Sequence, residues 1–281
     1  FGTLVYGRAS DSFGRKPVLL VGLTLFVLGS ALCAIAWNFE ILLIGRLIQA
    51  IAAGCGVVLA RAIARDVYGP EKLAQVIAYI TTAYVLGPTL APPIGGIISD
   101  FLGWKSVFGF ATVASVIIIV MAATVIPETH FARTPLRGSN KITRDYLRLF
   151  QNPIFFWYAM TPAFTSGAFF SLSTYATFLM RDQYGGTSGD YGLYFMLLTI
   201  GFMSGNYISG RVTNRVKTDF MVVAGCIIGI ITVELLAASV LFFPKSPLAL
   251  FLPGALLGMA QGLALPYAQA AAINAEPNLT G

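Results

Sequence analysis

Long apolar stretches separated by short polar breaks run along the whole chain. Residues 18–36 contain nineteen consecutive positions without a charge, VLLVGLTLFVLGSALCAIA. A helix needs about 20 apolar residues to cross a hydrocarbon core about 30 Å thick, and continuous apolar runs favour helices over alternating barrel strands. We therefore predict nine membrane segments, at residues 1–9 (a partial segment), 17–36, 40–60, 73–98, 104–126, 153–179, 190–211, 219–243 and 248–273.

Turn-forming sequences separate these segments, and the longest of them divides the chain into two halves. The shorter breaks are WNFE, DVYGPEK, SDFLG, QYGGTSGD and PKSP. The longest break, at 127–152, leaves a helical half at 1–126 and a second helical half at 153–281. GRASDS at 7–12 resembles GRVTNR at 210–215, which favours parallel repeats related by an axis along the membrane normal.

The composition fits an all-α membrane protein with the lipid bilayer as its solvent. Of 281 residues, 57% are hydrophobic and only 11% are charged. A soluble domain keeps roughly a quarter of its residues charged. The fold class that we predict is therefore a polytopic helical bundle.

Lysine and arginine residues are concentrated in alternate breaks. The positive-inside rule places the rich breaks in the cytoplasm, so residues 7–17 and the central loop are predicted to be cytoplasmic. The net charge of +6 then reflects topology and gives no support for nucleic-acid binding. The breaks poor in lysine and arginine hold three such residues, Lys105, Arg181 and Lys245. Arg46 lies inside a segment. Fourteen residues form the rich set: Arg8, Arg15, Lys16, Arg61, Arg65, Lys72, Arg133, Arg137, Lys141, Arg144, Arg148, Arg211, Arg215 and Lys217.

Nothing in the sequence favours an enzyme, a metal site or a bound cofactor. The cysteines, Cys33, Cys55 and Cys226, are far apart in apolar runs, and His130 has no Cys or His neighbours. A phosphate-cradling glycine-rich loop followed by Lys-Ser/Thr is absent from the sequence. ATP is therefore not the expected energy source.

Three motifs resemble signatures of the major facilitator superfamily. The first, Gly7-x-x-x-Asp11-x-x-Gly14-Arg15-Lys16, is similar to the cytoplasmic loop between the second and third of twelve helices, although Ser12 stands where a basic residue is common. The second, RLIQAIAAG from Arg46, resembles the fourth-helix signature, and GPTLAPPIGG from Gly87 resembles the antiporter signature of the fifth helix. Together with ARAIARD at 60–66, these motifs resemble Bcr/CflA-type drug/proton antiporters most closely.

This resemblance implies a partial twelve-helix fold with two incomplete, pseudo-repeated halves. The first helix, about half of the second, and the eleventh and twelfth would lie outside the chain. It also implies a monomer in the bacterial inner membrane that exports small apolar or cationic drug-like compounds, with the proton gradient as its energy source. The alternatives are transport of a sugar or other metabolite, a receptor or membrane enzyme, and a fragment that transports nothing by itself.

The first motif is a candidate conformational gate. In the superfamily this loop holds the two halves in one state and releases them in the other. Asp11 is expected to accept hydrogen bonds from the N-terminus of a neighbouring helix, and Arg15 to pair with Asp66. The alternative is that these charges only anchor helix ends. The candidate gate residues are Gly7, Asp11, Gly14, Arg15, Lys16 and Asp66.

Arg46 is the cation placed inside a predicted segment, about six residues from its start. A mid-membrane arginine costs about 2.5–3.5 kcal/mol or more, so it is normally paired or faces water. The resemblance assigns Arg46 and Gln49 to proton coupling, with an acid on the first helix. The alternative is that Arg46 reaches the outer headgroups, because Glu40 begins the same helix.

The segment at 73–98 is expected to be a bent helix packed closely against another. Small residues recur every four positions at Ala83, Gly87, Ala91, Gly95 and Ser99, which lets another helix approach. Prolines remove backbone donors and bend helices. The antiporter motif residues are Gly87, Pro88, Pro92, Gly95 and Gly96, and the alternative is a generic packing seam. Gly254, Gly258 and Gly262 form a similar stripe, interpreted as packing first and substrate contact second.

Polar and aromatic residues of the second half are candidates for an apolar substrate cavity. Glu234 is the acid deep within a segment. One interpretation is that it binds a protonatable substrate; the other is that it is protonated, or faces lipid, and has no role in transport. Aromatic residues of 153–179 either line the cavity or contact lipid and core. The candidate cavity residues are Phe164, Phe169, Tyr175, Asn206, Glu234 and Gln261.

Overall fold

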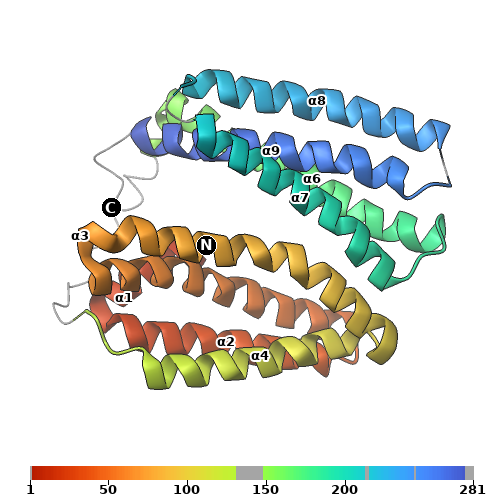
Figure 1. Ribbon diagram of the computed structural model, residues 1–281. Helices are drawn as coiled ribbons and strands as arrows, with labels where there is room; N and C mark the ends of the chain where they lie inside the picture. The colour runs from red at the N-terminus through yellow and green to blue at the C-terminus, as the bar shows by residue number, and fades with distance from the viewer. Residues whose placement is uncertain (1, 131–147, 213–214, 244, 276–281) are drawn as a thin grey trace. The chain divides into compact units, whose positions relative to one another are not determined.

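The computed structural model describes the chain except residues 1, 131–147, 213–214, 244 and 276–281, and it shows a helical protein (Figure 1). The charges at Arg133, Arg137, Lys141 and Arg144 lie outside the described residues. The predicted all-α polytopic fold is confirmed, and each predicted segment overlaps a helix. The helices are α1 (Gly2–Phe13), α2 (Arg15–Ala34), α3 (Phe39–Leu102), α4 (Trp104–Val125), α6 (Pro153–Asp182), α7 (Ser188–Val212), α8 (Thr218–Phe242) and α9 (Leu248–Ala275).

Among the described residues, five helices are long and apolar enough to cross a membrane. They lie at Arg15–Ala34, Phe39–Gly69, Trp104–Val125, Thr218–Phe242 and Leu248–Ala272. The helices α6, with 30 residues, and α7, with 25, are also long enough to span but are less apolar. Their glycine, threonine, serine and tyrosine residues, with Asn206 in α7, lower the hydropathy.

Two compact units make up the structure. Unit 1 consists of Phe1–Tyr84 and Ile98–Arg137, and unit 2 consists of Val85–Ile97 and Gly138–Gly281. In unit 1, α2 packs against α4, and buried Tyr6, Leu19 and Leu59 belong to its apolar core. In unit 2, α9 packs against α6, α7 and α8, so α9 is the central helix of that unit.

Single glycines replace three of the predicted loops. Gly14 between α1 and α2 has φ of 100°, Gly69 within α3 has φ of 64°, and Gly103 between α3 and α4 has φ of 82°. The loop predicted at 7–17 is therefore a one-residue turn between two helices, and the turn signals DVYGPEK and SDFLG each come down to one glycine. A left-handed glycine reverses or kinks the chain in one residue, which lets the helices run on through flanking polar residues.

Polar side chains cap two helix starts where the sequence supplies asparagine. Asn38 accepts a hydrogen bond from the backbone N–H of Ile41 at 2.9 Å, at the start of α3. Asn152 accepts from Ile154 and Phe155 at 3.0 and 3.3 Å, and Pro153 occupies the first turn of α6. Asparagine caps and early prolines are both favourable at helix N-termini, so α6 begins where the central loop ends.

The glycine stripe of α9 is a packing seam, as predicted. A Cβ atom added to Gly258 would overlap the backbone of Leu198 on α7, and one added to Gly262 would overlap that of Phe202. Gly201 and Gly205 on α7 meet the backbone of α9 in the same way. Small residues on both helices therefore allow the backbones of α7 and α9 to touch.

The packed face of the Val85–Ile97 segment is offset from the predicted stripe. Thr89, Pro93 and Gly96 are buried, whereas Gly87 and Ala91 are exposed. Within unit 2, a Cβ atom on Gly192 would lie 2.5 Å from the carbonyl oxygen of Pro92. A four-residue repeat of small residues does not specify which helix face is covered, and here the 89, 93, 96 spacing follows the helical repeat.

The helix remains regular through Pro88, Pro92 and Pro93, since Gly69 is the position within α3 that departs from helical angles. Pro88 is exposed, Pro92 is half-buried and Gly95 is half-buried. The functional role of the antiporter motif stays a prediction.

Candidate functional site

Arg15 is the centre of an ion-pair cluster at the junction of α1 and α2. Its Nη1 atom lies 2.6 Å from Oδ1 of Asp11, and its Nε atom lies 3.1 Å from Oδ2 of Asp66. The hydroxyl of Ser10 accepts another hydrogen bond from Nη1. The Arg15 side chain is only 3% exposed. A buried guanidinium needs charged or hydrogen-bonding partners, and these come from both α1 and α3.

Glu128 joins this cluster from the segment that follows α4. Its Oε1 atom accepts a hydrogen bond from the backbone N–H of Arg15 at 2.8 Å, and Oε2 accepts from that of Lys16 at 3.3 Å. The backbone N–H groups of Thr129 and His130 also donate to Oε1, each at 2.9 Å. Glu128 therefore satisfies N–H groups at the start of α2, where an anion is favoured.

The environment of Glu128 lowers the pKa of its carboxyl group. Partial burial raises this pKa, but the hydrogen bonds from the backbone N–H groups of His130, Arg15, Thr129 and Lys16 outweigh the burial. The carboxylate form is thus stabilised at neutral pH.

Two further contacts bring together the start of α2, the part of α3 just before its kink at Gly69, and the end of α4. The Nζ atom of Lys16 donates to the carbonyl oxygen of Ala123 at 2.7 Å. The hydroxyl of Thr129 donates to Oδ2 of Asp66 at 3.4 Å. The residues that sequence reasoning grouped on one membrane side therefore meet at one end of this unit.

The two glycines of the first motif have different structural roles. Gly14 has φ of 100°, and a Cβ atom there would lie 2.5 Å from Oε2 of Glu128. Gly7 lies inside α1, where an added Cβ would make an ordinary contact of 3.7 Å with Val58. Only Gly14 therefore needs glycine for both its backbone angle and the space beside it.

The described structure places Asp11 against Arg15, and it is Glu128 that accepts from a helix N-terminus. The ion pair expected between Arg15 and Asp66 is present. Sequence reasoning missed Glu128, although a single acid directly after an apolar segment was the available signal. Whether the cluster works as a gate stays a prediction.

Arg46 and Gln49 are in contact on α3. The Nη1 atom of Arg46 donates to Oε1 of Gln49 at 3.1 Å, and the guanidinium lies 5.9 Å from the ring centre of Phe108 on α4. Gln49 is buried, and its Nε2 atom donates to the hydroxyl of Ser30 on α2 at 2.7 Å. The proton-coupling role expected of Arg46 stays a prediction.

An apolar cavity of about 240 Å³ lies between α6, α8 and α9 in unit 2. Phe164 and Gln261 line it, together with Gly225, Cys226 and Gly229. Gln261 donates to the hydroxyl of Ser166 at 2.8 Å, which fixes its side-chain amide. The cavity can hold a small apolar molecule, with Gln261 at its wall.

The other candidate cavity residues do not line this space. Phe169 packs edge-to-face on Phe195 in the core, and Tyr175 is exposed. Glu234 is exposed on α8, next to the lining residue Val233. Asn206 is half-buried on α7, where its backbone faces Gly262. The structure therefore brings two of the six residues together.

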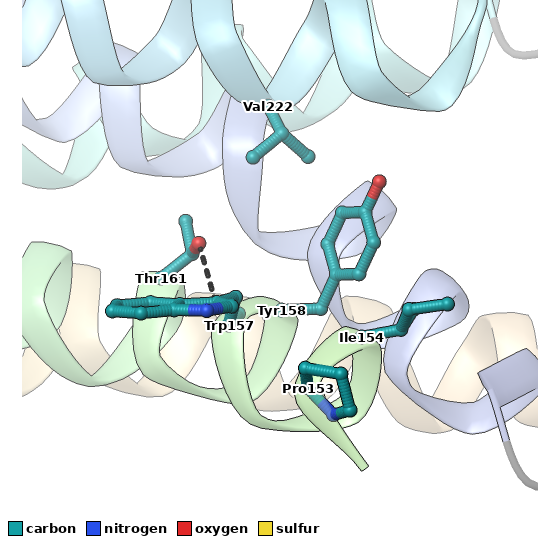
Figure 2. A pocket seen from close by; sticks show the side chains of 6 residues that line it. All are labelled: Pro153, Ile154, Trp157, Tyr158, Thr161 and Val222. Atoms are coloured by element: carbon teal, nitrogen blue, oxygen red, sulfur yellow. Dashed lines mark hydrogen bonds between the residues drawn. The ribbon is translucent and has the colours of Figure 1, made fainter.

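A second hollow, of about 350 Å³, lies at the start of α6 (Figure 2). Val222 faces it from α8, and the hydroxyl of Thr161 donates to the carbonyl oxygen of Trp157 at 3.1 Å. Tyr158 donates to Asp219, which ties the start of α6 to the first turn of α8. The hollow is lined by Pro153, Ile154, Trp157, Tyr158, Thr161 and Val222.

A family model described as Major Facilitator Superfamily matches residues 1–280. The chain belongs to this superfamily. The family predicted from the three motifs is therefore confirmed, and the chain is a multi-pass membrane protein.

Relatives of this superfamily member include proteins named for drug resistance. A bicyclomycin resistance protein homolog of Haemophilus influenzae is 31% identical over 79% of this chain and 56% of its own length. Multidrug resistance protein D of Escherichia coli is 26% identical over 99% of this chain and 69% of its own length. The chain spans about half the length of the first curated relatives it matches, between 53% and 56%.

Solved transporter structures share the fold at low sequence identity. A D-xylose-proton symporter superposes with a TM-score of 0.71 at 14% identity, covering 99% of this chain and 74% of that chain. A bacterial homolog of the human lysosomal transporter Spinster gives a TM-score of 0.69 at 18% identity, covering 96% and 64%. These likenesses show the fold alone and say nothing of substrate.

Proposed function

We propose that the protein containing this chain exports small apolar or cationic compounds in exchange for protons, by alternating access. The observation that supports this most is the buried Arg15, which bridges Asp11 on α1 and Asp66 on α3. Charges drawn from separate helices can pair in one state and separate in another, as a conformational gate requires. The drug-resistance names of the relatives favour export of drug-like compounds over sugar transport.

The proton gradient is the proposed energy source, with no bound cofactor. Arg46 and Gln49 are the proposed coupling residues. A cation in a membrane segment is costly, so a functional role is the default explanation for its presence. The protein is proposed to act as a monomer in the bacterial inner membrane. The end of unit 1 that holds Arg15, Asp66 and Glu128 would face the cytoplasm.

A drug-accumulation assay tests the proposed function. Cells expressing the protein, with any further sequence that its gene encodes, should accumulate less of a fluorescent cationic dye than cells with an empty vector. A proton uncoupler should abolish the difference. Bicyclomycin belongs in the panel because one relative is named for resistance to it. Equal accumulation with and without the uncoupler would exclude proton antiport.

Two variants separate the gate from general damage. Asp11→Asn removes one carboxylate from Arg15 and should reduce export while leaving membrane insertion intact. Asp182→Asn is the control, because Asp182 is 70% exposed at the end of α6 and lies 4.0 Å from Arg181. Normal export by Asp11→Asn would contradict the gate.

A further inference from the structure

A chain of hydrogen bonds connects α2 to Arg46 on α3. The hydroxyl of Ser30 donates to the carbonyl oxygen of Phe26 at 2.8 Å. The same hydroxyl oxygen accepts from Nε2 of Gln49 at 2.7 Å, and Oε1 of Gln49 accepts from Arg46 at 3.1 Å. This chain of hydrogen bonds therefore ends at the guanidinium of Arg46.

Burial makes this chain of contacts specific. Ser30 is 0% exposed and Gln49 is 6% exposed, and both lie in membrane-spanning helices. Water cannot replace a lost partner there, so each polar group depends on the next. Arg46 itself is exposed, so the buried pair supports a cation at the surface of unit 1.

The donor and acceptor count fixes the direction of the Gln49 amide. Ser30 has one O–H donor, and the carbonyl of Phe26 uses it. Ser30 can therefore only accept from Gln49, so the NH₂ group of Gln49 faces Ser30 and its carbonyl oxygen faces away. Arg46 is donor-only, so that oxygen is the partner its guanidinium requires.

Close approach of α2 and α3 makes the contact reachable. A Cβ atom on Gly29 would lie 2.9 Å from the backbone nitrogen of Gln49 and 2.9 Å from the carbonyl oxygen of Gly45. The residue next to Gly29 is Ser30, and its short side chain spans the remaining gap. Helix packing by small residues thus sets the position of a polar contact.

Ser115 on α4 provides a comparison. It is also buried, at 5% exposure, and its hydroxyl donates to the carbonyl oxygen of Ala111 at 2.6 Å. Such bonding to the preceding turn is common for serine in apolar helices. Ser30 differs because its oxygen also receives a side chain from another helix.

We propose that Ser30 is a positioning residue that, through Gln49, holds the guanidinium of Arg46 in one direction for proton coupling. Ser30 touches neither substrate nor proton in this proposal. The inference rests on the proposed function of the protein as a proton-coupled exporter. Without the bond to Ser30, Gln49 is free to rotate, and Arg46 loses its fixed direction while keeping its charge.

Two fluxes in proteoliposomes distinguish coupling from transport. The protein is purified with any further sequence that its gene encodes. The first flux is substrate exchange with equal concentrations on both sides and no pH gradient. The second is uptake driven by an imposed pH gradient, and both fluxes use the fluorescent cationic dye of the accumulation assay. The ratio of driven to exchange flux measures coupling. If the imposed pH gradient does not raise the driven flux of the wild-type protein, the proposed function is contradicted, independently of Ser30.

The variants Ser30→Val and Ser30→Thr have nearly the same shape and differ in the hydroxyl group. Ser30→Val is expected to lower the coupling ratio about threefold to tenfold, the effect of one net hydrogen bond. Ser30→Thr should restore most of the wild-type ratio. Equal ratios for the two variants would overturn the proposal, because packing alone would then explain the effect.

Two further variants complete the test. Ser115→Val replaces a buried hydroxyl that bonds to its own helix at Ala111 and not to Gln49, so it should keep the wild-type ratio. A fall equal to that of Ser30→Val would contradict the proposal. Exchange flux reports whether each variant folds. If Ser30→Val gives no exchange, Ser30→Cys replaces it, since cysteine changes the size of the side chain less than valine does and its sulfur accepts hydrogen bonds weakly. A wild-type ratio in Ser30→Cys together with loss in Ser30→Thr would also overturn the proposal.

Discussion

The Nε atom of Arg15 lies 3.1 Å from Oδ2 of Asp66, although 51 positions separate the two residues in the chain. Replacing Arg15 with alanine removes the cation that pairs with the carboxylates of Asp11 and Asp66. Breaking a buried ion pair lowers the free energy of unfolding by about 3–5 kcal/mol. Because the Asp11 side chain is 46% exposed, we expect a smaller loss for Arg15→Ala, of at least about 2 kcal/mol. Thermal unfolding in detergent should show the loss.

Arg65→Ala is the matched control for this prediction. Arg65 neighbours Asp66 in sequence, but its side chain is 65% exposed and its Nε atom lies 3.9 Å from Oδ1 of Asp66. An exposed pair of this kind contributes under about 1 kcal/mol. Equal melting temperatures for Arg15→Ala and Arg65→Ala would show that burial of Arg15 has no energetic consequence.

The two glycines of the first motif should respond differently to alanine. Gly14→Ala forces a left-handed backbone on a residue with a Cβ, at a cost of about 1–2 kcal/mol, and crowds Glu128 as well. Gly7→Ala adds a methyl group in ordinary contact with Val58 inside a helix, where alanine is preferred over glycine by about 1 kcal/mol. Melting temperatures should therefore fall for Gly14→Ala and stay level or rise for Gly7→Ala. The opposite order would contradict the assigned turn geometry.

Glu128→Gln should destabilise the protein in a pH-dependent way. The pKa of Glu128 is lowered by folding from its ordinary value of 4.5, so its carboxylate stabilises the folded state above that pH. This contribution is lost as the pH falls through the lower pKa of the folded state. At neutral pH the variant should lose about 0.5–2 kcal/mol, the usual range for a lost helix cap.

The measurement is a pair of melting curves for wild type and Glu128→Gln at pH 7 and at the lowest pH the detergent sample tolerates. The gap between the two proteins should narrow as the pH falls below about 4.5. Asp182→Asn, which changes an exposed acid, should show no such narrowing. A constant gap would mean that charge at Glu128 is not what stabilises the start of α2.

The helices were predictable because the length of an apolar run is a local property of the sequence. The single-residue turns were not, because a positive φ at Gly14, Gly69 or Gly103 becomes visible only in the backbone. Polar residues next to those glycines suggested turns or loops, yet they belong to helices.

Partners within the site were predictable only where a motif linked them. The pairing of Arg15 with Asp66 was expected from the first motif. The contact between Glu128 and Arg15 spans 113 positions and gives no local pattern. Phe164 and Phe169 look alike in sequence, but Phe164 reaches a cavity and Phe169 packs on Phe195, because neighbouring helices decide which face is covered.

The predicted membrane orientation can be measured with two single-cysteine variants. Arg65 belongs to the lysine- and arginine-rich set and Lys105 to the poor set, and both are exposed. With Cys33, Cys55 and Cys226 replaced, an impermeant maleimide should label Lys105→Cys in intact cells. Arg65→Cys should react only after the membrane is opened. The reverse pattern would invert the topology and place the Arg15 cluster outside the cytoplasm.

The cavity between α6, α8 and α9 gives the last prediction. Gly229 lines this cavity, and an added Cβ would make an ordinary 3.9 Å contact with Ala260, so a larger side chain has room to extend into the cavity. Gly229→Leu should therefore fill much of the volume without opening the helix contact. If the cavity binds an apolar substrate, the affinity for that substrate should fall about tenfold or more, because buried ligand surface is lost.

Gly167→Leu on α6 is the control for this substitution, since an added Cβ there meets nothing within 4 Å and Gly167 does not line the cavity. Equilibrium binding of a fluorescent apolar dye to the purified protein compares the two variants. Unchanged affinity in Gly229→Leu would exclude the cavity as the substrate site. Loss in both variants would indicate a general effect of leucine on the bundle. Loss in Gly229→Leu alone would connect Phe164 and Gln261 to the bound molecule, because they share its walls.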